Sequence, residues 1–344
     1  MVIQESPNPQ TVPATSASEV VIAIPTLNEA EHIADVLKQL LANEPYAAAC
    51  QCVVMDGGSR DKTREIVQGL RARYPNLSLI DNPKKTQAHA MNLLLGSIFE
   101  DAQIAIRCDA HAEYPPGFVQ NLVRAIETND EASSVVISMD ARSAGSCFRR
   151  GFALVADTKI GAGGAMHRGG QSSGWVAHGH HAAFRLDKFR ELGGYDTSFR
   201  ANEDAEYDQR LIQTGGRIWL DANIRIGYFP RDTLRGLWKQ YWHYGLGRAR
   251  NCAKHRSKLA LRQLIPLFHV ILIAIALFLS PFTWVGLLWP LAYLIIICGT
   301  ALALFLRHGT ICALWAAPAL AAMHMAWGLG FIKGWMAEPK GHRA

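Results

Sequence analysis

Short groups of acidic and polar residues follow three apolar, strand-like runs of the chain, and their side chains are suited to catalysis or binding. The groups are PTLNE from Pro25 to Glu29, DGGSRD from Asp56 to Asp61, and Asp109-Ala110-His111. Carboxylates can bind a divalent cation, accept hydrogen bonds from a base or ribose, or take a proton from an attacking hydroxyl. Each group alone could be an ordinary turn or helix cap. Three groups delivered to one place predict a binding site.

A parallel sheet would bring these groups together. The first 140 residues alternate helical patterns with apolar runs at Val20–Ile24, Val53–Met55, Leu77–Ile80, Ile104–Arg107 and Val135–Ile137. This alternation predicts βαβ units and a mostly parallel, Rossmann-like α/β sheet, in which ligands bind beyond the carboxyl ends of the strands. The sequence contains neither GxGxxG nor GxxxxGK[ST], which argues against those two nucleotide-binding loops.

A further acidic pair, Glu203-Asp204, follows Asn202. One interpretation is a general base, and the other is a helix start, where acids complement the helix dipole. The two interpretations are compatible. Adjacent residues point in different directions, so the pair cannot flank one glycosidic bond as the two carboxylates of a glycosidase do.

The composition predicts a membrane segment. No Asp, Glu, Lys or Arg occurs in the 43 residues from Leu264 to Leu306, or in the 25 residues from His308 to Ile332. As a helix the longer stretch would measure about 64 Å, twice the ~30 Å hydrocarbon core, which indicates two crossings that turn near Ser280-Pro281. The shorter stretch indicates a third crossing. The alternative is a set of buried helices in a soluble protein.

The net charge of +6 is also localised. Residues 231–262 contain nine Lys or Arg against Asp232 alone, a net charge of +8, and residues 263–344 add +3, so residues 1–230 have a net charge of −5. This distribution argues against a nucleic-acid partner and predicts that the basic segment faces the cytoplasm, near anionic lipid headgroups. Three crossings would place Lys333, Lys340 and Arg343 on the opposite side. Either the positive-inside tendency is overridden or one stretch does not cross fully.

The basic segment contains a helical apolar stripe, formed by Leu234, Leu237, Trp238, Tyr241 and Trp242. We interpret it as an interfacial helix, with a helix packed on the catalytic domain as the alternative. Residues 1–18 lack the features of a secretory signal and are expected to form a flexible polar tail. The Gly- and Ser-rich residues 141–174 are expected to form a mobile loop. Seven cysteines without a CxxC pair favour a reducing compartment and argue against a disulfide framework or a zinc site.

The order of these motifs resembles that of the family 2 glycosyltransferases of the GT-A fold. More closely, GWVAHGHHAAFR (174–185), LGGYD (192–196), NEDAEYDQRL (202–211) and QYWHYGLGRAR (240–250) resemble the succinoglycan-biosynthesis branch, over residues 19–260. Members of this branch add a sugar to a polyprenyl-diphosphate-linked acceptor. We therefore expect a GT-A domain at 19–230, a basic connector at 231–262, membrane helices at 263–333 and a polar tail at 334–344.

The resemblance also implies roles for individual residues. The donor nucleotide would be bound by Thr26, Glu29, Asp56 and Asp109. Asp109 is the first residue of the family's Asp-x-Asp and would bind a divalent metal, Mg²⁺ or Mn²⁺. The last position of that motif is His111, a departure that slightly favours Mn²⁺. Asp204 matches the general base, which would act in a single displacement that inverts the anomeric centre.

The acceptor or diphosphate site would involve a larger set: His178, His180, Glu203, Gln240, His243, Tyr244 and Arg248. After Gln240, this chain has His243-Tyr244 at the positions where processive relatives have Arg-Trp. The resulting hypothesis is a membrane-anchored transferase of the cytoplasmic membrane that uses a UDP-hexose, with UDP-glucose favoured, and a lipid-linked acceptor. Alternatives are a sugar transferase onto polyprenyl phosphate, a non-catalytic nucleotide-sugar-binding subunit of a synthase, and a metal-dependent hydrolase.

Overall fold

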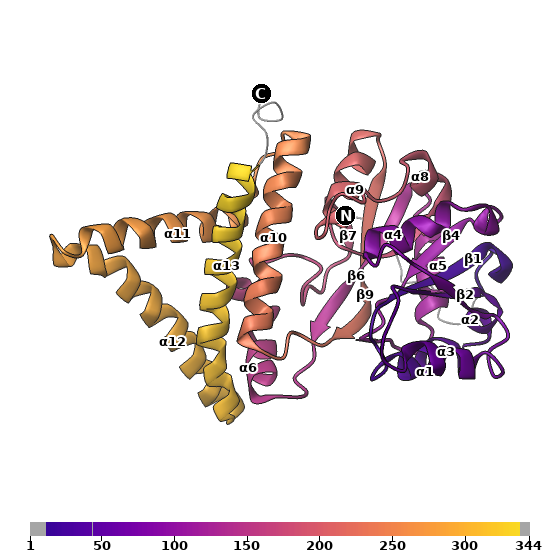
Figure 1. The fold of residues 1–344 in the computed structure, drawn as a ribbon, viewed down its shortest axis with the longest axis horizontal. Coiled ribbons are helices and arrows are strands. Elements are labelled where there is room, and N and C mark those ends of the chain that lie inside the picture. Colours follow the sequence, from indigo (N-terminus) through magenta and orange to yellow (C-terminus); the bar gives the residue numbers. More distant parts are fainter. Residues whose placement is uncertain (1–11, 43, 338–344) are drawn as a thin grey trace. The chain divides into compact units, whose positions relative to one another are not determined.

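The computed structural model describes residues 12–42 and 44–337. The chain forms two compact units (Figure 1). The first contains residues 1–139, 170–198 and 203–228, and the second contains residues 140–169, 199–202 and 229–344. The first unit therefore contains all of the acidic groups, and the second contains the basic and apolar segments.

The first unit is built on a mixed sheet of nine strands in the order β3-β2-β1-β4-β8-β6-β9-β5, with β7 paired to β9. The strands β1 to β4 are parallel, and β8 is antiparallel to both β4 and β6. This arrangement confirms the predicted α/β fold and places β1, β2 and β4 side by side. The sheet is mixed rather than mostly parallel, because β7 and β5 also pair with β9 in the antiparallel sense. The strands are β1 (Val20–Thr26), β2 (Gln51–Asp56), β3 (Leu77–Asp81), β4 (Ile104–Arg107), β5 (Ala112–Glu113), β6 (Ala132–Ala141), β7 (Gly174–Val176), β8 (His180–Arg185) and β9 (Arg217–Tyr228).

Helices bury both faces of this sheet. Along β1, Ile22 and Ile24 join one hydrophobic cluster while Val21 and Ala23 join the other, because successive side chains of a strand point to opposite faces. The first cluster includes residues of α1 and α5, and the second includes residues of α4, α8 and α9. This two-sided burial explains the nearly continuous apolar runs in the sequence. The α-helices are α1 (Ile33–Leu41), α2 (Pro45–Ala49), α3 (Thr63–Leu70), α4 (Gln87–Asn92), α5 (Phe118–Thr128), α8 (Leu186–Glu191) and α9 (Glu203–Gln213).

The second unit is helical. It contains α6 (Cys147–Ala156), α7 (Lys159–Ala162), α10 (Leu234–His255), α11 (Leu261–Leu279), α12 (Leu288–His308) and α13 (Ala316–Ala337), with short 3₁₀ turns η4 (Trp284–Leu287) and η5 (Ile311–Trp315). Within the described residues, the segments 261–279, 284–308 and 311–337 are long and apolar enough to span a bilayer. In Figure 1, α13 lies beside α10, whereas α11 and α12 form a hairpin that diverges from this pair.

Glycines allow α10 and α13 to pack with their backbones in direct contact. A Cβ added at Gly245 of α10 would lie 2.1 Å from the carbonyl oxygen of Trp327, and one added at Gly330 of α13 would lie 2.3 Å from that of Trp242. The stripe predicted at 234–242 forms the first part of α10, where Leu237 is buried and Trp238 is partly exposed. The basic segment is therefore a helix that packs along its length on an apolar helix.

Two sequence-based expectations need correction in this unit. A disulfide joins Cys147 of α6 to Cys312 of η5. The sequence did not indicate it, because the two cysteines are 165 positions apart and meet only through the packing of α6 on η5. Residues 141–174, expected to form a loop, contain α6 and α7. The cap Ser146, whose hydroxyl accepts a hydrogen bond from the backbone N–H of Arg149, starts α6.

The close contact of α10 with α13 can be tested by a single methyl group. Gly245→Ala would force the two helices apart, and we expect a loss of about 1–3 kcal/mol of stability. The matched control is Gly299→Ala in α12, where an added Cβ meets no atom within 4 Å. Thermal unfolding of the detergent-solubilised protein should show a lower midpoint for Gly245→Ala only. Equal midpoints for the two variants would contradict the packing described.

Candidate active site

The loops that follow β1 and β2 are joined by hydrogen bonds. The backbone N–H of Asn28 donates to the Ser59 hydroxyl at 2.8 Å, and the Asn28 side-chain oxygen accepts from the N–H of Arg60 at 2.8 Å. Asn28 adopts a left-handed conformation with φ 57°, which an asparagine tolerates better than most residues. Two groups that are 31 residues apart thus form one rim at the carboxyl end of the sheet.

Asp56 organises this rim. Its carboxylate accepts hydrogen bonds from the backbone N–H groups of Gly58 and Ser59, from the Ser59 hydroxyl and from Arg64. Burial alone would raise the pKa of Asp56, but the bonds from Ser59 and Arg64 hold it below its usual range. Arg64 also reaches Asp81 at the end of β3, at 2.6 Å. The carboxylate is therefore ionised and fully enclosed by its own loop.

Thr26 and Glu29 also lie at this rim. Thr26 is buried, and its hydroxyl donates to the carbonyl of Ile24. The carboxylate of Glu29 lies 2.9 Å from Nδ1 of His111, which belongs to the third acidic group. Because His111 follows β4 and Glu29 follows β1, this contact confirms that the carboxyl ends of neighbouring parallel strands meet.

The carboxylate of Asp109 lies between two cationic or polar groups. One oxygen is 3.4 Å from the guanidinium of Arg107, and the other is 3.3 Å from Nε2 of His180. Burial alone would raise the pKa of Asp109, but His180 and Arg107 lower it well below its usual range. His180 begins β8, which is paired with β4 in the antiparallel sense, so sheet pairing brings this histidine to the rim.

Arg107 is buried at the end of β4 and is the electrostatic centre of the site. Burial opposes its charge, but the negative charges of Asp109, Asp204 and Glu203 raise its pKa. The side-chain oxygen of Gln87, in the orientation that satisfies its hydrogen bonds, accepts from Nε of Arg107 at 2.8 Å. Arg107 and Gln87 were not among the site residues predicted from the sequence. The available signal was a single arginine inside an apolar strand, two residues before Asp109.

The acidic pair lies at the start of α9, as its helix-start interpretation predicted. Glu203 is buried and Asp204 is half-buried. Burial, together with the charge of Asp204, raises the pKa of Glu203 to about 7. Glu203 is therefore partly protonated at neutral pH.

The remaining predicted residues are divided between the two units. His178 lies 2.6 Å from the buried carboxylate of Asp208 on α9, in the first unit. Gln240, His243, Tyr244 and Arg248 all lie on α10 in the second unit. There, Gln240 donates to the Tyr244 hydroxyl at 2.9 Å, and Arg248 donates to Gln263 at 3.1 Å.

A metal ion would need ligands from outside the protein. No group of three or more His, Cys, Asp or Glu among the described residues could hold an ion alone. Mg²⁺ commonly uses only one or two carboxylates, together with water and substrate phosphates. Asp109, ionised and near the imidazoles of His111 and His180, fits a metal that arrives with a diphosphate.

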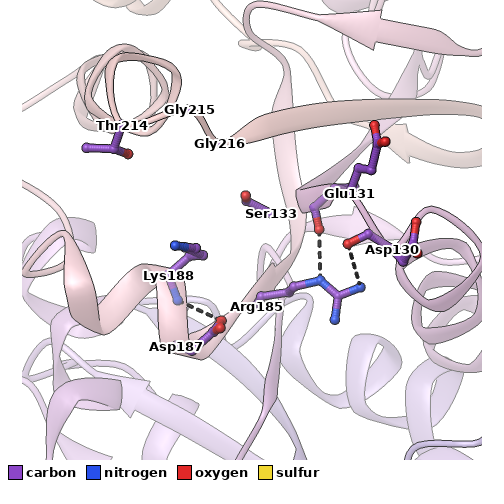
Figure 2. A pocket seen from close by; sticks show the side chains of 10 residues that line it. Asp130, Glu131, Ser133, Arg185, Asp187, Lys188, Thr214, Gly215 and Gly216 are labelled. Carbon is purple, nitrogen blue, oxygen red and sulfur yellow. Dashed lines mark hydrogen bonds between the residues drawn. The ribbon is translucent and has the colours of Figure 1, made fainter.

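A surface hollow of about 430 Å³ lies elsewhere in the first unit (Figure 2). It is lined by residues that include Arg185 and Asp187, and Arg185 donates hydrogen bonds to the backbone carbonyls of Ile126 and Ala132. Arg185 ends the strand that His180 begins, so at 3.3 Å per residue the two are about 16 Å apart along β8. The hollow is thus separate from the acidic rim.

The raised pKa of Glu203 predicts a pH-dependent stability. A carboxyl with a pKa of about 7 in the folded state and 4.5 ordinarily binds its proton more tightly when folded, so stability falls as pH rises from about 4.5 to 7. Glu203→Gln should therefore exceed the wild type by up to about 3 kcal/mol at pH 8 and lose this advantage near pH 4.5. Thermal unfolding across this range, with exposed Glu65→Gln as control, measures the effect. A gap that does not change with pH would refute the assignment.

Comparisons with known proteins identify the family of this chain. The family pattern of Glycosyl transferase family 2 matches residues 21–193. The chain is 39% identical to the succinoglycan biosynthesis protein ExoA of Rhizobium meliloti (strain 1021), over 92% of this chain and 94% of that protein. It is 23% identical to the dolichyl N-acetyl-alpha-D-glucosaminyl phosphate 3-beta-D-2,3-diacetamido-2,3-dideoxy-beta-D-glucuronosyltransferase of Methanococcus voltae, over 65% of this chain and 71% of that protein.

The fold is also similar to a solved structure. The mannosyltransferase PcManGT of Pyrobaculum calidifontis, solved in complex with GDP-Man and Mn²⁺, superposes with a TM-score of 0.59 at 21% identity, over 96% of this chain and 90% of that one. The match of the family pattern and the extended similarity to ExoA, together with the acidic rim on a mixed α/β sheet, establish that this chain belongs to glycosyltransferase family 2.

Proposed function

We propose that the protein is a membrane-anchored, inverting glycosyltransferase that transfers a hexose, glucose from UDP-glucose in the favoured case, to a polyprenyl-diphosphate-linked sugar in exopolysaccharide biosynthesis. The observation that carries the proposal is the charge network around Arg107. This one buried cation interacts with Asp109, the expected donor-side carboxylate, and with Asp204, the expected base. A donor and an acceptor bound at these two carboxylates would be neighbours.

On the donor side, the rim formed by Thr26, Glu29 and Asp56 would recognise the nucleotide. Asp56 is enclosed by Ser59 and Arg64, so we assign it the role of shaping the loop that receives the base and ribose. Asp109, with His111 or His180 nearby, would hold a divalent cation, which would neutralise the diphosphate leaving group. The chemistry of Asp109 supports this role because the carboxylate stays ionised despite its burial.

On the acceptor side, Asp204 would act as the general base. It is half-buried at the first turn of α9, a position that fixes its backbone and favours a negative charge through the helix dipole. As the acceptor hydroxyl attacks the anomeric carbon, its proton passes to Asp204 and the bond to the diphosphate breaks on the opposite face. This single displacement inverts the anomeric centre. Because its raised pKa leaves Glu203 partly protonated near neutral pH, this residue would place less negative charge beside Asp204.

The acceptor is proposed to be a lipid-linked sugar. The name of ExoA describes a protein of succinoglycan biosynthesis, and the name of the Methanococcus relative describes transfer to a dolichyl-phosphate-linked sugar. Apolar helices that could span a bilayer and the basic α10 fit a substrate held at a membrane surface. Gln240, His243, Tyr244 and Arg248 of α10 are the candidate contacts to the diphosphate, with His178 as a candidate contact to the sugar. The first unit would face the cytoplasm, where nucleotide sugars are made.

Replacement of the base should abolish transfer without loss of the fold. We expect Asp204→Asn to lower the turnover rate by about 10²- to 10⁴-fold, because an amide cannot accept the proton. Binding of UDP should remain within about twofold of the wild type. The control is Asp187→Asn, an exposed carboxylate at the hollow of Figure 2. Full transfer activity in Asp204→Asn would exclude it as the base and would favour a non-catalytic role for the protein.

A donor and acceptor screen tests the proposed function itself. Purified protein is supplied with radiolabelled UDP-glucose, UDP-galactose or GDP-mannose, with Mg²⁺, Mn²⁺ or a chelator, and with defined lipid acceptors. We expect labelled glucose to appear only on the polyprenyl-diphosphate sugar and only with metal. Transfer onto polyprenyl phosphate alone would instead support the sugar-phosphate transferase alternative. Release of free sugar or UMP without an acceptor would support a hydrolase.

A further inference from the structure

The three apolar helices of the second unit differ sharply in their exposure. The helices α11 and α12 expose large side chains along most of their lengths, among them Ile275, Phe278, Leu291, Ile295 and Leu302. In contrast, no residue of α13 from 316 to 332 is exposed. Hydrocarbon would have to cover the first two helices, whereas α13 is already covered by protein.

Besides α11 and α12, which also contact it, α13 is covered by three helices that are not candidate membrane spans: α10, α7 and α6. The basic helix α10 lies beside it, with Gly245 and Gly330 in the contact. The helix α7 contacts the middle of α13, where Nε2 of His324 lies 3.2 Å from the carbonyl oxygen of Ile160 in α7. Toward the start of α13, Phe148 of α6 packs edge-on against Trp315 of η5. A crossing by α13 would therefore require these neighbours to enter the bilayer with it.

The charges on α10 make that outcome unfavourable. Within its 22 residues this helix carries the cations Arg235, Lys239, Arg248, Arg250 and Lys254 and no acidic residue. The exposed cations Arg235 and Lys239 would have to leave water for hydrocarbon, where charged side chains are costly. At the level of the headgroups the same cations would be favourable, because they would face anionic lipid.

In contrast to the basic α10, the hairpin of α11 and α12 has the length and the apolar surface of a membrane hairpin. Its helices contain 19 and 21 residues, or about 28 and 32 Å, close to the ~30 Å hydrocarbon core. Cations occur only at its open end, at Arg262 and Arg307, while the turn between the helices has the uncharged and exposed Phe282 and Trp284. Figure 1 shows the hairpin diverging from the α10–α13 pair toward this turn.

We infer that the α11–α12 hairpin alone enters the bilayer interior, and that α13 returns along α10 at the membrane surface. The occupant of the exposed hairpin surface is lipid hydrocarbon, and anionic headgroups face α10. The end of α13 then lies on the same side of the membrane as the glycosyltransferase unit. This topology places Lys333 on the side of the basic segment, in agreement with the positive-inside tendency.

The test compares the two ends of the chain in sealed vesicles. One epitope tag is placed before residue 1 and another after residue 344, and protease is added to right-side-out and inside-out vesicles. We expect both tags to be protected in right-side-out vesicles and both to be cleaved in inside-out vesicles. Cleavage of the two tags in opposite preparations would show a third crossing and overturn the inference.

A second measurement avoids any disturbance by a tag. Met336→Cys near the end of α13 and Glu31→Cys on the catalytic unit are both exposed positions. A membrane-impermeant maleimide should label both in inside-out vesicles, with less than one-tenth of that labelling in right-side-out vesicles. The unsubstituted protein, with its exposed Cys298, supplies the background. Labelling of the two cysteines from opposite sides would refute the topology, whatever the outcome of the transfer assays.

Discussion

One buried cation, Arg107, holds the acidic site together. Asp109 and the adjacent pair Glu203-Asp204 come from different parts of the chain, and their charges would repel one another at the end of β4 if Arg107 were absent. A buried guanidinium is in turn costly unless carboxylates and hydrogen bonds surround it. The carboxylates and Arg107 therefore require one another. Within this group, burial and then the neighbouring charge of Asp204 raise the pKa of Glu203 to about 7.

The sequence predicts the part of the site that depends on parallel strands. Glu29, Asp56 and Asp109 each follow an apolar run, and the rule that ligands bind beyond the carboxyl ends of parallel strands is sufficient to group them. The contact of Glu29 with His111 shows that the grouping is correct. The partners of Asp109 could not be predicted in this way. His180 arrives on an antiparallel strand, β8, whose position next to β4 no local pattern specifies.

Amino-acid composition also fails to predict how α13 differs from α11 and α12. Hydropathy still selects 311–337, although the mean hydropathy of this segment is below that of the two preceding segments, because hydropathy counts side chains and ignores their neighbours. The difference lies in small residues such as Gly330, Gly334 and Ala326, which let α13 approach other helices closely. The disulfide between Cys147 and Cys312 escapes sequence reasoning for the same reason. Both features depend on which helices meet, and that is decided by tertiary packing.

The charge of the site bears on how an anionic donor could bind there. The rim exposes the carboxylates of Glu29 and Asp109, and two of its arginines are already engaged, Arg64 by Asp56 and Arg107 by Asp109. The exposed Arg60 of the same rim is the arginine left to meet a nucleotide diphosphate. In the proposed reaction, a divalent cation that binds together with the donor would supply the charge that a single arginine does not, with Asp109 as its carboxylate ligand. The charge of the rim and the position of Asp109 thus both favour a donor that binds together with a metal ion.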